Sequence, residues 1–299
     1  MSYEQSIALL DEETILAECG PMRLAIRAWQ NSRPQIALCR QAAEASFSYL
    51  AAIAKHKTVL SDFAGNIKAL PENDLAQRMI ESVRAIGDID LTPMAAVAGT
   101  IADAVADWLF GRGLTKVMVD NGGDIAIRLA AGETATVGIR PQINRFDISH
   151  IARLDDRRSS WGVTTSGLGG RSFTRGIASA VTVLAASASV ADAAATAIAN
   201  ACFVKDKNIR QAPAEQIDPN TDLAGKMVTV CIGKLARAKR KVAQINALQR
   251  AEDLVAGGVI VGALICQDKL FSMTSSLAAR IHRIDDCRNG SRTRACGLP

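Results

Sequence analysis

The sequence predicts an α/β protein of the α+β type, with helices packed on a mixed, largely antiparallel sheet. In some segments apolar residues recur at intervals of three and four, and in others they form short runs between turn signals. No Pro/Gly-rich linker and no tandem repeat divides the 299 residues. We therefore expect one domain over residues 1–284, with a polar and basic excursion at about 205–257 and an irregular basic tail over 285–299.

The first third of the chain predicts strands followed by three helices. Residues 1–33 have the mixed polarity of strands and turns. Helical spacing then covers 34–57, 72–85 and 93–110, and Gly87 ends the second helix. The third helix is almost free of charge, so it should be buried on most sides, with Asp103 and Asp107 returning it to the surface. Its small residues could also form contacts in a homo-oligomer.

From residue 115 the period changes to that of strands. Short apolar runs at 116–120, 125–129, 134–140, 161–165 and 177–185 predict strands, and a small-residue helix follows over 189–202. Residues 205–223 are polar and contain two prolines, which favours a loop. Residues 235–254 then predict a basic helix. A last strong strand covers 257–266, and residues 269–273 could pair with it.

Composition excludes several classes of function. The formal net charge is +5 and aromatic residues make up 4% of the chain. Because bases stack on aromatic side chains and this chain has few of them, nucleic-acid binding is not expected. The seven cysteines form no CxxC pair, which favours a reducing compartment. The chain shows no signal peptide and no apolar run of about 18 residues, so we expect a cytoplasmic protein without a membrane span.

The pair Asp192 and Thr196 is the first candidate for chemistry. Their spacing of four places a carboxylate and a hydroxyl on one face of an alanine-rich helix. Two oxygen ligands suit a hard cation such as Mg²⁺. The alternative is structural, because an aspartate near a helix start favours the dipole and threonine often packs.

Two glycine-containing segments are candidates for substrate binding. Asn121-Gly122-Gly123-Asp124 permits a close ligand approach, but it also fits a plain hairpin turn. The second segment combines hydroxyls, exposed N–H groups and arginines in an anion cradle, or else forms a flexible surface loop. It consists of Thr164, Thr165, Ser166, Gly167, Leu168, Gly169, Gly170, Arg171 and Ser172, with Arg175 close behind. No GxxxxGK[ST], GxSxG or HExxH motif is present.

Four motifs in this order resemble the ApbE superfamily, whose founding members are FAD:protein FMN transferases. They are LTPMAAVAG at 91–99, VDNGGDI at 119–125, GVTTSG at 162–167, and AVTVLA at 180–185 leading into ADAAATA at 191–197. The likeness is closer to an uncharacterised ApbE-related sister family. It implies a T-fold-like architecture. It also implies that Asp192 and Thr196 match the magnesium-holding positions, and that 121–124 and 165–167 match the glycine-turn and TSG segments.

The chain departs from the transferases between the TSG segment and the next strand. Residues 168–179 contain neither the histidine nor the Asp-Pro of their His-Ile-Ile-Asp-Pro-like segment, and Arg171 stands at the apparent histidine position. Arginine cannot act as a base at neutral pH, but it can clamp a carboxylate or phosphate. The resemblance therefore implies a flavin-transferase-like ancestry without carrying over the use of flavin.

These observations lead to three hypotheses of function. The first is an enzyme acting on a small anionic or nucleotide-like metabolite, with Asp192, Ser166 and Arg171 as catalytic candidates and a divalent metal on Asp192 and Thr196. The second is FMN transfer from FAD. The third is a non-catalytic binding or assembly module, in which the basic run 234–241 is the partner surface; a solvated helix face would explain that run equally.

Overall fold

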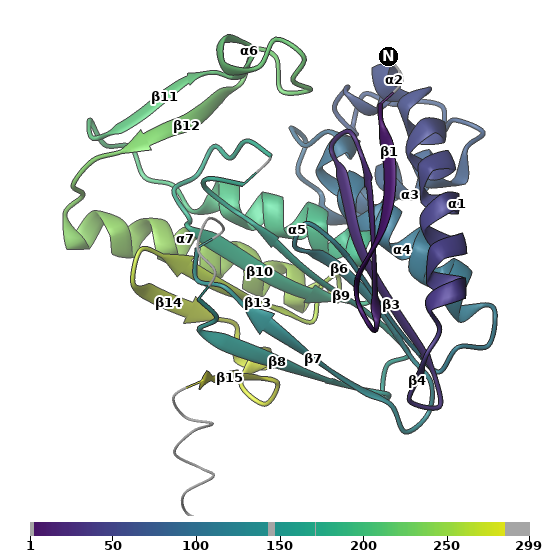
Figure 1. Ribbon diagram of the computed structural model, residues 1–299. Helices are drawn as coiled ribbons and strands as arrows, with labels where there is room; N and C mark the ends of the chain where they lie inside the picture. Colours follow the sequence, from purple (N-terminus) through teal and green to yellow (C-terminus); the bar gives the residue numbers. More distant parts are fainter. Residues whose placement is uncertain (1–2, 143–146, 171, 285–299) are drawn as a thin grey trace, which may run out of the picture.

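A ten-stranded sheet organises the computed structural model, which describes residues 3–142, 147–170 and 172–284 (Figure 1). The strand order is β1-β2-β3-β5-β6-β9-β10-β13-β14, with β4 beside β3, and every pairing among these strands is antiparallel. The strands are β1 (Gln5–Asp11), β2 (Thr14–Cys19), β3 (Met22–Gln30), β4 (Arg33–Pro34), β5 (Lys116–Asn121), β6 (Asp124–Leu129), β9 (Ser160–Ser166), β10 (Ala180–Ala185), β13 (Gly262–Gln267) and β14 (Leu270–Met273).

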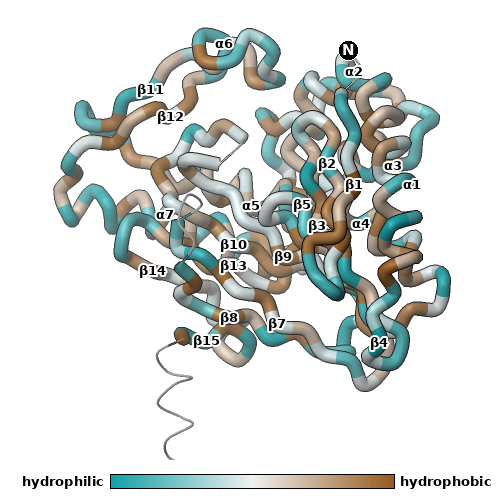
Figure 2. Tube along the Cα trace, in the orientation of Figure 1, coloured by the Kyte–Doolittle hydropathy of each residue, from teal (hydrophilic) through white to brown (hydrophobic). Residues whose placement is uncertain are grey.

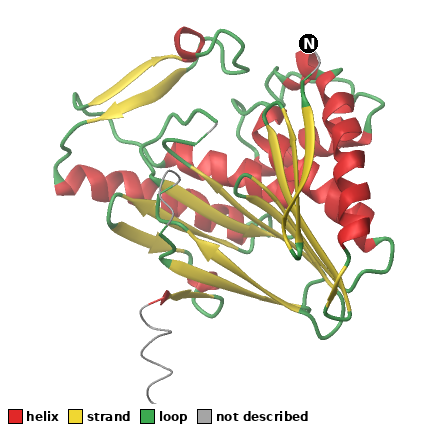
Figure 3. Ribbon diagram, in the orientation of Figure 1, coloured by secondary structure: helices red, strands yellow, loops and turns green. Residues whose placement is uncertain are grey.

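One face of this sheet carries the long helices, as Figure 3 shows. Contacts pair α1 with β2 and β3, α4 with β5 and β6, α5 with β9 and β10, and α7 with β13. The α/β class expected from the sequence is confirmed. The α-helices are α1 (Ile36–Ala54), α2 (Lys57–Leu60), α3 (Asp74–Ile86), α4 (Val97–Phe110), α5 (Ala188–Ala201), α6 (Ala214–Ile217) and α7 (Arg237–Ala256); short 3-10 turns cover Pro93–Ala96 and Ser275–Leu277.

A second, three-stranded sheet packs on the opposite face. Its order is β15 (Ile281–Arg283), β8 (His150–Asp155), β7 (Thr134–Ile139). Apolar side chains of β7 and β8 join Ile127, Trp161 and Val163 of the main sheet in a core separate from the one under the helices. The strand β8 was not predicted from the sequence, whereas β7 was.

The excursion predicted at about 205–257 begins with an arm, which we define as residues 205–234. The arm contains β11 (Ile209–Pro213), α6 and β12 (Met227–Ile232), and its two strands pair with each other in a sheet of their own. Figure 1 shows the arm standing off the main sheet, beyond the start of α7. The prediction of a loop over 205–223 was therefore wrong, because β11 takes its partner from within the arm.

The charge-poor helix predicted at 93–110 becomes a 3-10 turn and α4, and it lies in the core. By length and composition alone Pro93–Phe110 could cross a membrane, but more than half of this stretch is buried inside the protein. The helix α4 contacts α1, α3 and α5 of the same chain. Asp103 does not return the helix to the surface as predicted, since its exposed fraction is 0%.

Hydropathy along the chain follows these layers, with brown segments concentrated in the sheet and in the inner helices (Figure 2). Cys19, Cys39, Cys202 and Cys266 are free and buried, so they pack as small hydrophobic residues in the core. Burial raises the pKa of the Cys39 thiol to about 11, so this thiol stays protonated and unreactive. The predicted tail over 285–299 lies outside the described residues.

Candidate functional site

The helix α5 begins at a capped turn and lies unusually close to its neighbours. The Ser187 hydroxyl accepts the N–H of Val190 at 3.3 Å and caps the helix. A Cβ added to Gly99 of α4 would lie 2.3 Å from the carbonyl oxygen of Ala188, and one on Gly162 of β9 would lie 2.1 Å from that of Ser187. Glycine at both positions lets the start of α5 sit directly against α4 and β9.

A buried ion pair fixes this end of α5. The Asp103 carboxylate accepts the N–H of Ala188 at 3.1 Å and that of Ser189 at 2.9 Å. Arg128 on β6 donates to the same carboxylate from Nη2 at 2.9 Å and to Asp107 from Nε at 2.9 Å. Negative charge at a helix N-terminus is favourable, and the buried guanidinium balances it. Asp103 is therefore a structural residue that positions α5.

Asp192 lies one turn further along α5, where it points toward α4. Its side chain is buried, and its Oδ2 accepts the N–H of Gly99 at 3.0 Å. Burial raises the pKa of Asp192 to about 7; backbone N–H groups of Gly99 and Ala98 oppose this rise, and the charge of Asp103 adds to it. A carboxyl group that is half ionised at neutral pH is poised to bind a cation or to exchange a proton.

The face of α5 that carries Asp192 continues toward a cavity with both polar and apolar walls. Thr196 and Asn200 follow at intervals of four, and both line a cavity of about 380 Å³. Ser172, Arg175 and Met94 line the same cavity, so three residues predicted from the sequence meet here: Thr196, Ser172 and Arg175. Its remaining walls come from residues 90–95, from Lys57, Pro21 and Phe173, and from residues 218–223 of the arm.

The guanidinium of Arg175 is already engaged in this cavity. It forms two hydrogen bonds with the Asp90 carboxylate, one of them from Nη2 to Oδ1 at 3.1 Å. These bonds hold the pKa of Asp90 below its usual range despite partial burial. An anion would have to compete with Asp90 for Arg175. Arg171, the other predicted clamp, lies outside the described residues.

The pleat of the sheet divides the remaining predicted residues between two faces. Thr164 pairs with Asp124 across β9 and β6, so their side chains share a face. That face is the helix side, because Asn121 of the adjoining strand donates to the carbonyl oxygen of Ala98 at 3.2 Å. Thr165 points to the opposite face. The predicted Thr164–Ser172 cradle therefore contributes to two different surfaces.

The hydroxyl of Thr164 is a buried polar group without a partner within the described part of the chain. Gly162, two residues earlier on β9, contacts Ser187 and Ala188. Two residues of strand span about 6.6 Å and four residues of helix about 6 Å. The side chain of Thr164 therefore lies on the helix side of the sheet, where α5 packs on β9.

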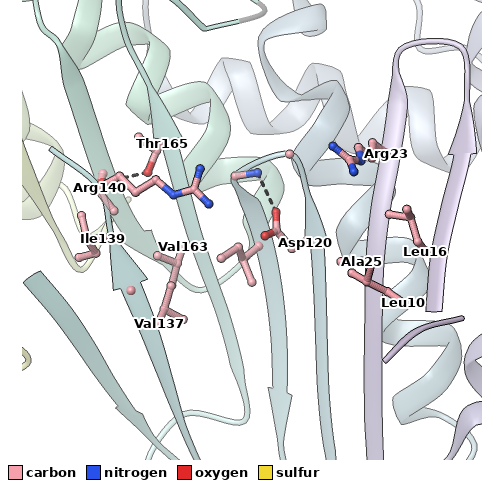
Figure 4. A pocket seen from close by; sticks show the side chains of 15 residues that line it. Leu10, Leu16, Arg23, Ala25, Asp120, Val137, Ile139, Arg140, Val163 and Thr165 are labelled. Atoms are coloured by element: carbon pink, nitrogen blue, oxygen red, sulfur yellow. Dashed lines mark hydrogen bonds between the residues drawn. The ribbon is translucent and has the colours of Figure 1, made fainter. Parts of the chain in front are cut away.

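A second pocket of about 360 Å³ opens on the far side of the sheet (Figure 4). Gly122, Gly123 and Thr165 line it, together with Arg23 and Arg140. The Thr165 hydroxyl is 2.9 Å from that of Thr182, and Asp120 accepts the N–H of Gly123 at 2.7 Å. The glycine turn thus forms a hydrogen-bonded hairpin turn, and its glycines border this pocket and not the cavity beside α5.

The glycine-rich loop itself runs between these two sites. Ser166 ends β9 opposite Val181, and Leu168 donates its N–H to the carbonyl oxygen of Ala178 at 2.8 Å. The N–H of Gly170 reaches the carbonyl oxygen of Gly167 at 3.3 Å, a turn that Gly169 permits through its positive φ of 88°. The loop is thus a hydrogen-bonded turn up to Gly170, not an open strand of backbone.

Sequence reasoning missed several residues that line the cavity. Asn200 could have been found as the next polar residue on the Asp192–Thr196 face, and Thr92 stands inside a quoted motif. Asp90 and the arm residues carried no local signal. Within the described residues, no group of three or more His, Cys, Asp or Glu side chains could hold a metal by itself.

Comparisons with known proteins agree with this architecture. The family described as AbpE bacteria matches residues 7–275. A UPF0280 protein of Methanococcus maripaludis strain C7 is 28% identical over 183 residues, which cover 60% of this chain and 73% of that protein. A UPF0280 protein of Archaeoglobus fulgidus is 39% identical over 127 residues, covering 42% of this chain and half, 50%, of that protein's length.

Solved structures with the same fold come from flavin transferases. The apo flavinyl transferase ApbE of Pseudomonas stutzeri aligns with a TM-score of 0.50 at 13% identity, covering 94% of this chain and 99% of that one. A single-site variant of the flavin transferase ApbE of Vibrio cholerae aligns with a TM-score of 0.53 at 13% identity, covering 93% and 99%. This likeness establishes the fold. Since the family match spans nearly the whole chain, the protein belongs to the AbpE bacteria family.

Proposed function

We propose that this protein is an enzyme that acts on a small anionic, nucleotide-like metabolite bound in the cavity beside α5, together with a divalent cation. The observation that carries the proposal is the position of Asp192. Its buried carboxyl group lies one turn from Thr196, and the same helix face opens into a cavity large enough for part of a nucleotide.

The residues at this point fit a magnesium ion. Burial of Asp192 without a nearby cation raises the pKa of its carboxyl, so a bound divalent ion would compensate a carboxylate that is otherwise desolvated. Thr196 adds a hydroxyl oxygen, and the Thr164 hydroxyl, which has no partner among the described residues, lies on the helix side of the sheet. Magnesium is commonly held by one or two protein oxygens plus water and ligand phosphates, which is the donor set available here.

The roles within the site follow from charge. A bound Mg²⁺ would supply positive charge for a phosphate or carboxylate of the metabolite. Asp192 and Thr196 would hold that ion, and Asn200 would orient the ligand. Ser166 and Arg171 stay candidates for the reaction from the sequence alone. We expect an anionic ligand to bind through the metal ion and not through Arg175, because the Arg175 guanidinium is already bonded to the Asp90 carboxylate.

Calorimetric titration of Mg²⁺ in the presence of ADP tests this proposal. The wild-type protein should bind the Mg–ADP complex, and Asp192→Asn should weaken binding about 10-fold or more through loss of an ionised ligand. The matched control is Asp120→Asn, the same substitution in the pocket on the other face of the sheet; it should bind as wild type does. Equal heats for wild type and Asp192→Asn would reject the proposal.

FMN transfer from FAD is a second candidate, supported by the alignment of the whole fold with flavin transferases. The absence of histidine and of Asp-Pro from residues 168–179 speaks against it. Incubation with FAD, Mg²⁺ and a flavinylation-target domain decides between the two. Covalent flavin on the target would establish transfer, and its absence across several divalent metals would leave the first proposal.

An assembly role for the basic run 234–241 has less support. Lys239 donates to the carbonyl oxygen of Lys205 at 3.0 Å, and Arg240 pairs with Asp268 at 3.1 Å. These contacts use part of the positive charge to attach α7 to the start of the arm and to the turn between β13 and β14. If the run bound an acidic partner, binding would fall steeply with added salt.

A further inference from the structure

The base of the arm is attached to the segment that carries Arg175. Gln211 of β11 donates from Nε2 to the carbonyl oxygen of Arg175 at 3.0 Å, and the Thr229 hydroxyl of β12 donates to the same oxygen at 3.0 Å. The N–H of Thr229 also reaches the carbonyl oxygen of Thr174 at 2.9 Å. Both strands of the arm are therefore held to one wall of the cavity.

The tip of the arm, residues 218–223, reaches across the cavity to the N-terminal half of the chain. The hydroxyl of Thr92 donates to Oδ2 of Asp222, and Lys57 donates from Nζ to the carbonyl oxygen of Asn220 at 3.5 Å. Next to the tip, Nζ of Lys226 lies 4.6 Å from the centre of the Phe63 ring. The tip thus forms a wall of the cavity that is held to the N-terminal half of the chain at Asn220 and Asp222.

This wall presents hydrogen-bond acceptors and no basic side chain. Asp218 is engaged locally, since its Oδ1 accepts the N–H of Asn220 at 2.9 Å. Asp222 is half-buried, and only its Oδ2 has a hydrogen bond among the described residues. Its Oδ1 is available to a ligand in the cavity. A carboxylate oxygen repels phosphate and accepts hydrogen bonds from hydroxyl groups.

The two ends of the cavity therefore differ in chemistry. At the α5 end, Thr196 lines the cavity and Asp192 lies one helical turn behind it, so a cation held by these two residues would draw in a phosphate. At the arm end, Asp222 favours neutral hydrogen-bond donors. The basic side chains of the described cavity lining, Arg175 and Lys57, are bonded to Asp90 and Asn220, and Lys226 beside the tip lies over the Phe63 ring. A ligand with a phosphate at one end and hydroxyl groups at the other matches this polarity.

We propose that the arm tip recognises the sugar hydroxyls of a nucleotide-type ligand, with Asp222 as the specificity-determining residue and Thr92 as the residue that positions it. This inference rests on the proposed function, because it assumes that the phosphate lies at the α5 end. A carboxylate held by one bond and open on its other oxygen can accept from a ribose hydroxyl without rearrangement of the arm.

The test compares ADP with 2′,3′-dideoxy-ADP in the presence of Mg²⁺, by calorimetry on the full chain. Wild type should bind ADP about 10- to 100-fold more tightly than the dideoxy analogue, the range for a hydrogen bond to a charged group. Asp222→Ala should bring this ratio close to one, and Thr92→Val should reduce it. Asp206→Ala, the same change at the base of the arm and outside the cavity lining, should keep the wild-type ratio.

The outcomes separate this inference from the proposed function. If wild type binds both nucleotides equally, or if Asp222→Ala keeps the wild-type ratio, the recognition of sugar hydroxyls by the arm is wrong while the magnesium-dependent site stands. If neither nucleotide binds and Asp192→Asn leaves Mg²⁺ binding unchanged, both proposals fail together.

Discussion

Arg128 and Asp103 form a buried ion pair, with Nη2 and Oδ1 2.9 Å apart, and the same carboxylate accepts two N–H groups at the start of α5. This links β6, α4 and α5 at one point. Because Gly99 of α4 donates to Asp192, a shift of α5 relative to α4 would also move the candidate site. The stability of this junction is therefore a condition for the site.

Removing one partner of the pair should be strongly destabilising. Arg128→Met leaves the Asp103 carboxylate buried without its counter-charge, and we expect a loss of about 3–5 kcal/mol in the free energy of unfolding. Urea denaturation measures it. Arg23→Met is the matched control, because Arg23 pairs with Glu18 on the exposed surface. This variant should lose no more than about 1 kcal/mol in its free energy of unfolding. Similar losses in both variants would contradict the structural role of Asp103.

The close approach of α5 to β9 gives a second prediction. Gly162→Ala places a Cβ within 2.1 Å of the Ser187 carbonyl oxygen, so α5 must shift and the free energy of unfolding should fall by about 2 kcal/mol or more. In Gly65→Ala no atom lies within 4 Å of the new Cβ, so the free energy of unfolding should change by less than about 0.5 kcal/mol. Thermal unfolding of the two variants provides the comparison, and equal Tm values would show that α5 is not held at this distance.

The raised pKa of Asp192 predicts a pH dependence with a definite sign. The folded protein holds a proton on this carboxyl up to about pH 7, whereas its ordinary pKa is 3.8. The stabilisation is therefore complete below about pH 4 and is lost as pH rises through 7. In the presence of EDTA, raising the pH from 5 to 8 should lower the Tm of the wild-type protein by more than that of Asp192→Asn. Parallel pH curves for the two proteins would show that Asp192 titrates normally.

Magnesium should reverse this trend, since the cation binds only the ionised carboxylate. The increase in Tm on adding Mg²⁺ with ADP is expected to be larger at pH 8 than at pH 6. In Asp192→Asn the increase should be small at both values. An increase that is the same at pH 6 and pH 8 in wild type would mean that the cation binds away from Asp192.

Prediction from the sequence succeeded for the part of the site whose polar residues repeat with the helical period of a single helix. Asp192 and Thr196 stand out on an alanine-rich helix, and their spacing alone places them on one face. The separation of Thr164 from Thr165 was also implicit, because successive strand residues face opposite ways. We instead expected the whole Thr164–Ser172 segment in one cradle, and the structure distributes it over two surfaces.

What could not be predicted depends on partners distant in the sequence. Asp103 looked like a surface residue because its counter-ion, Arg128, lies 25 positions away on a strand. The strand β11 was hidden by its polar composition and its terminal proline, Pro213, since its partner β12 lies within the same arm. The arm's place over the cavity depends on single contacts such as Thr92 to Asp222, 130 positions apart, which leave no pattern in the sequence.

The proposed divalent cation on Asp192 and Thr196 can be located in a crystal grown with Mn²⁺ and ADP by its anomalous scattering. An anomalous peak is expected within bonding distance of the Asp192 carboxylate and the Thr196 hydroxyl, and this peak should be lost in Asp192→Asn. A peak elsewhere with bound ADP, or ADP bound in the cavity without a metal beside Asp192, would contradict the proposal.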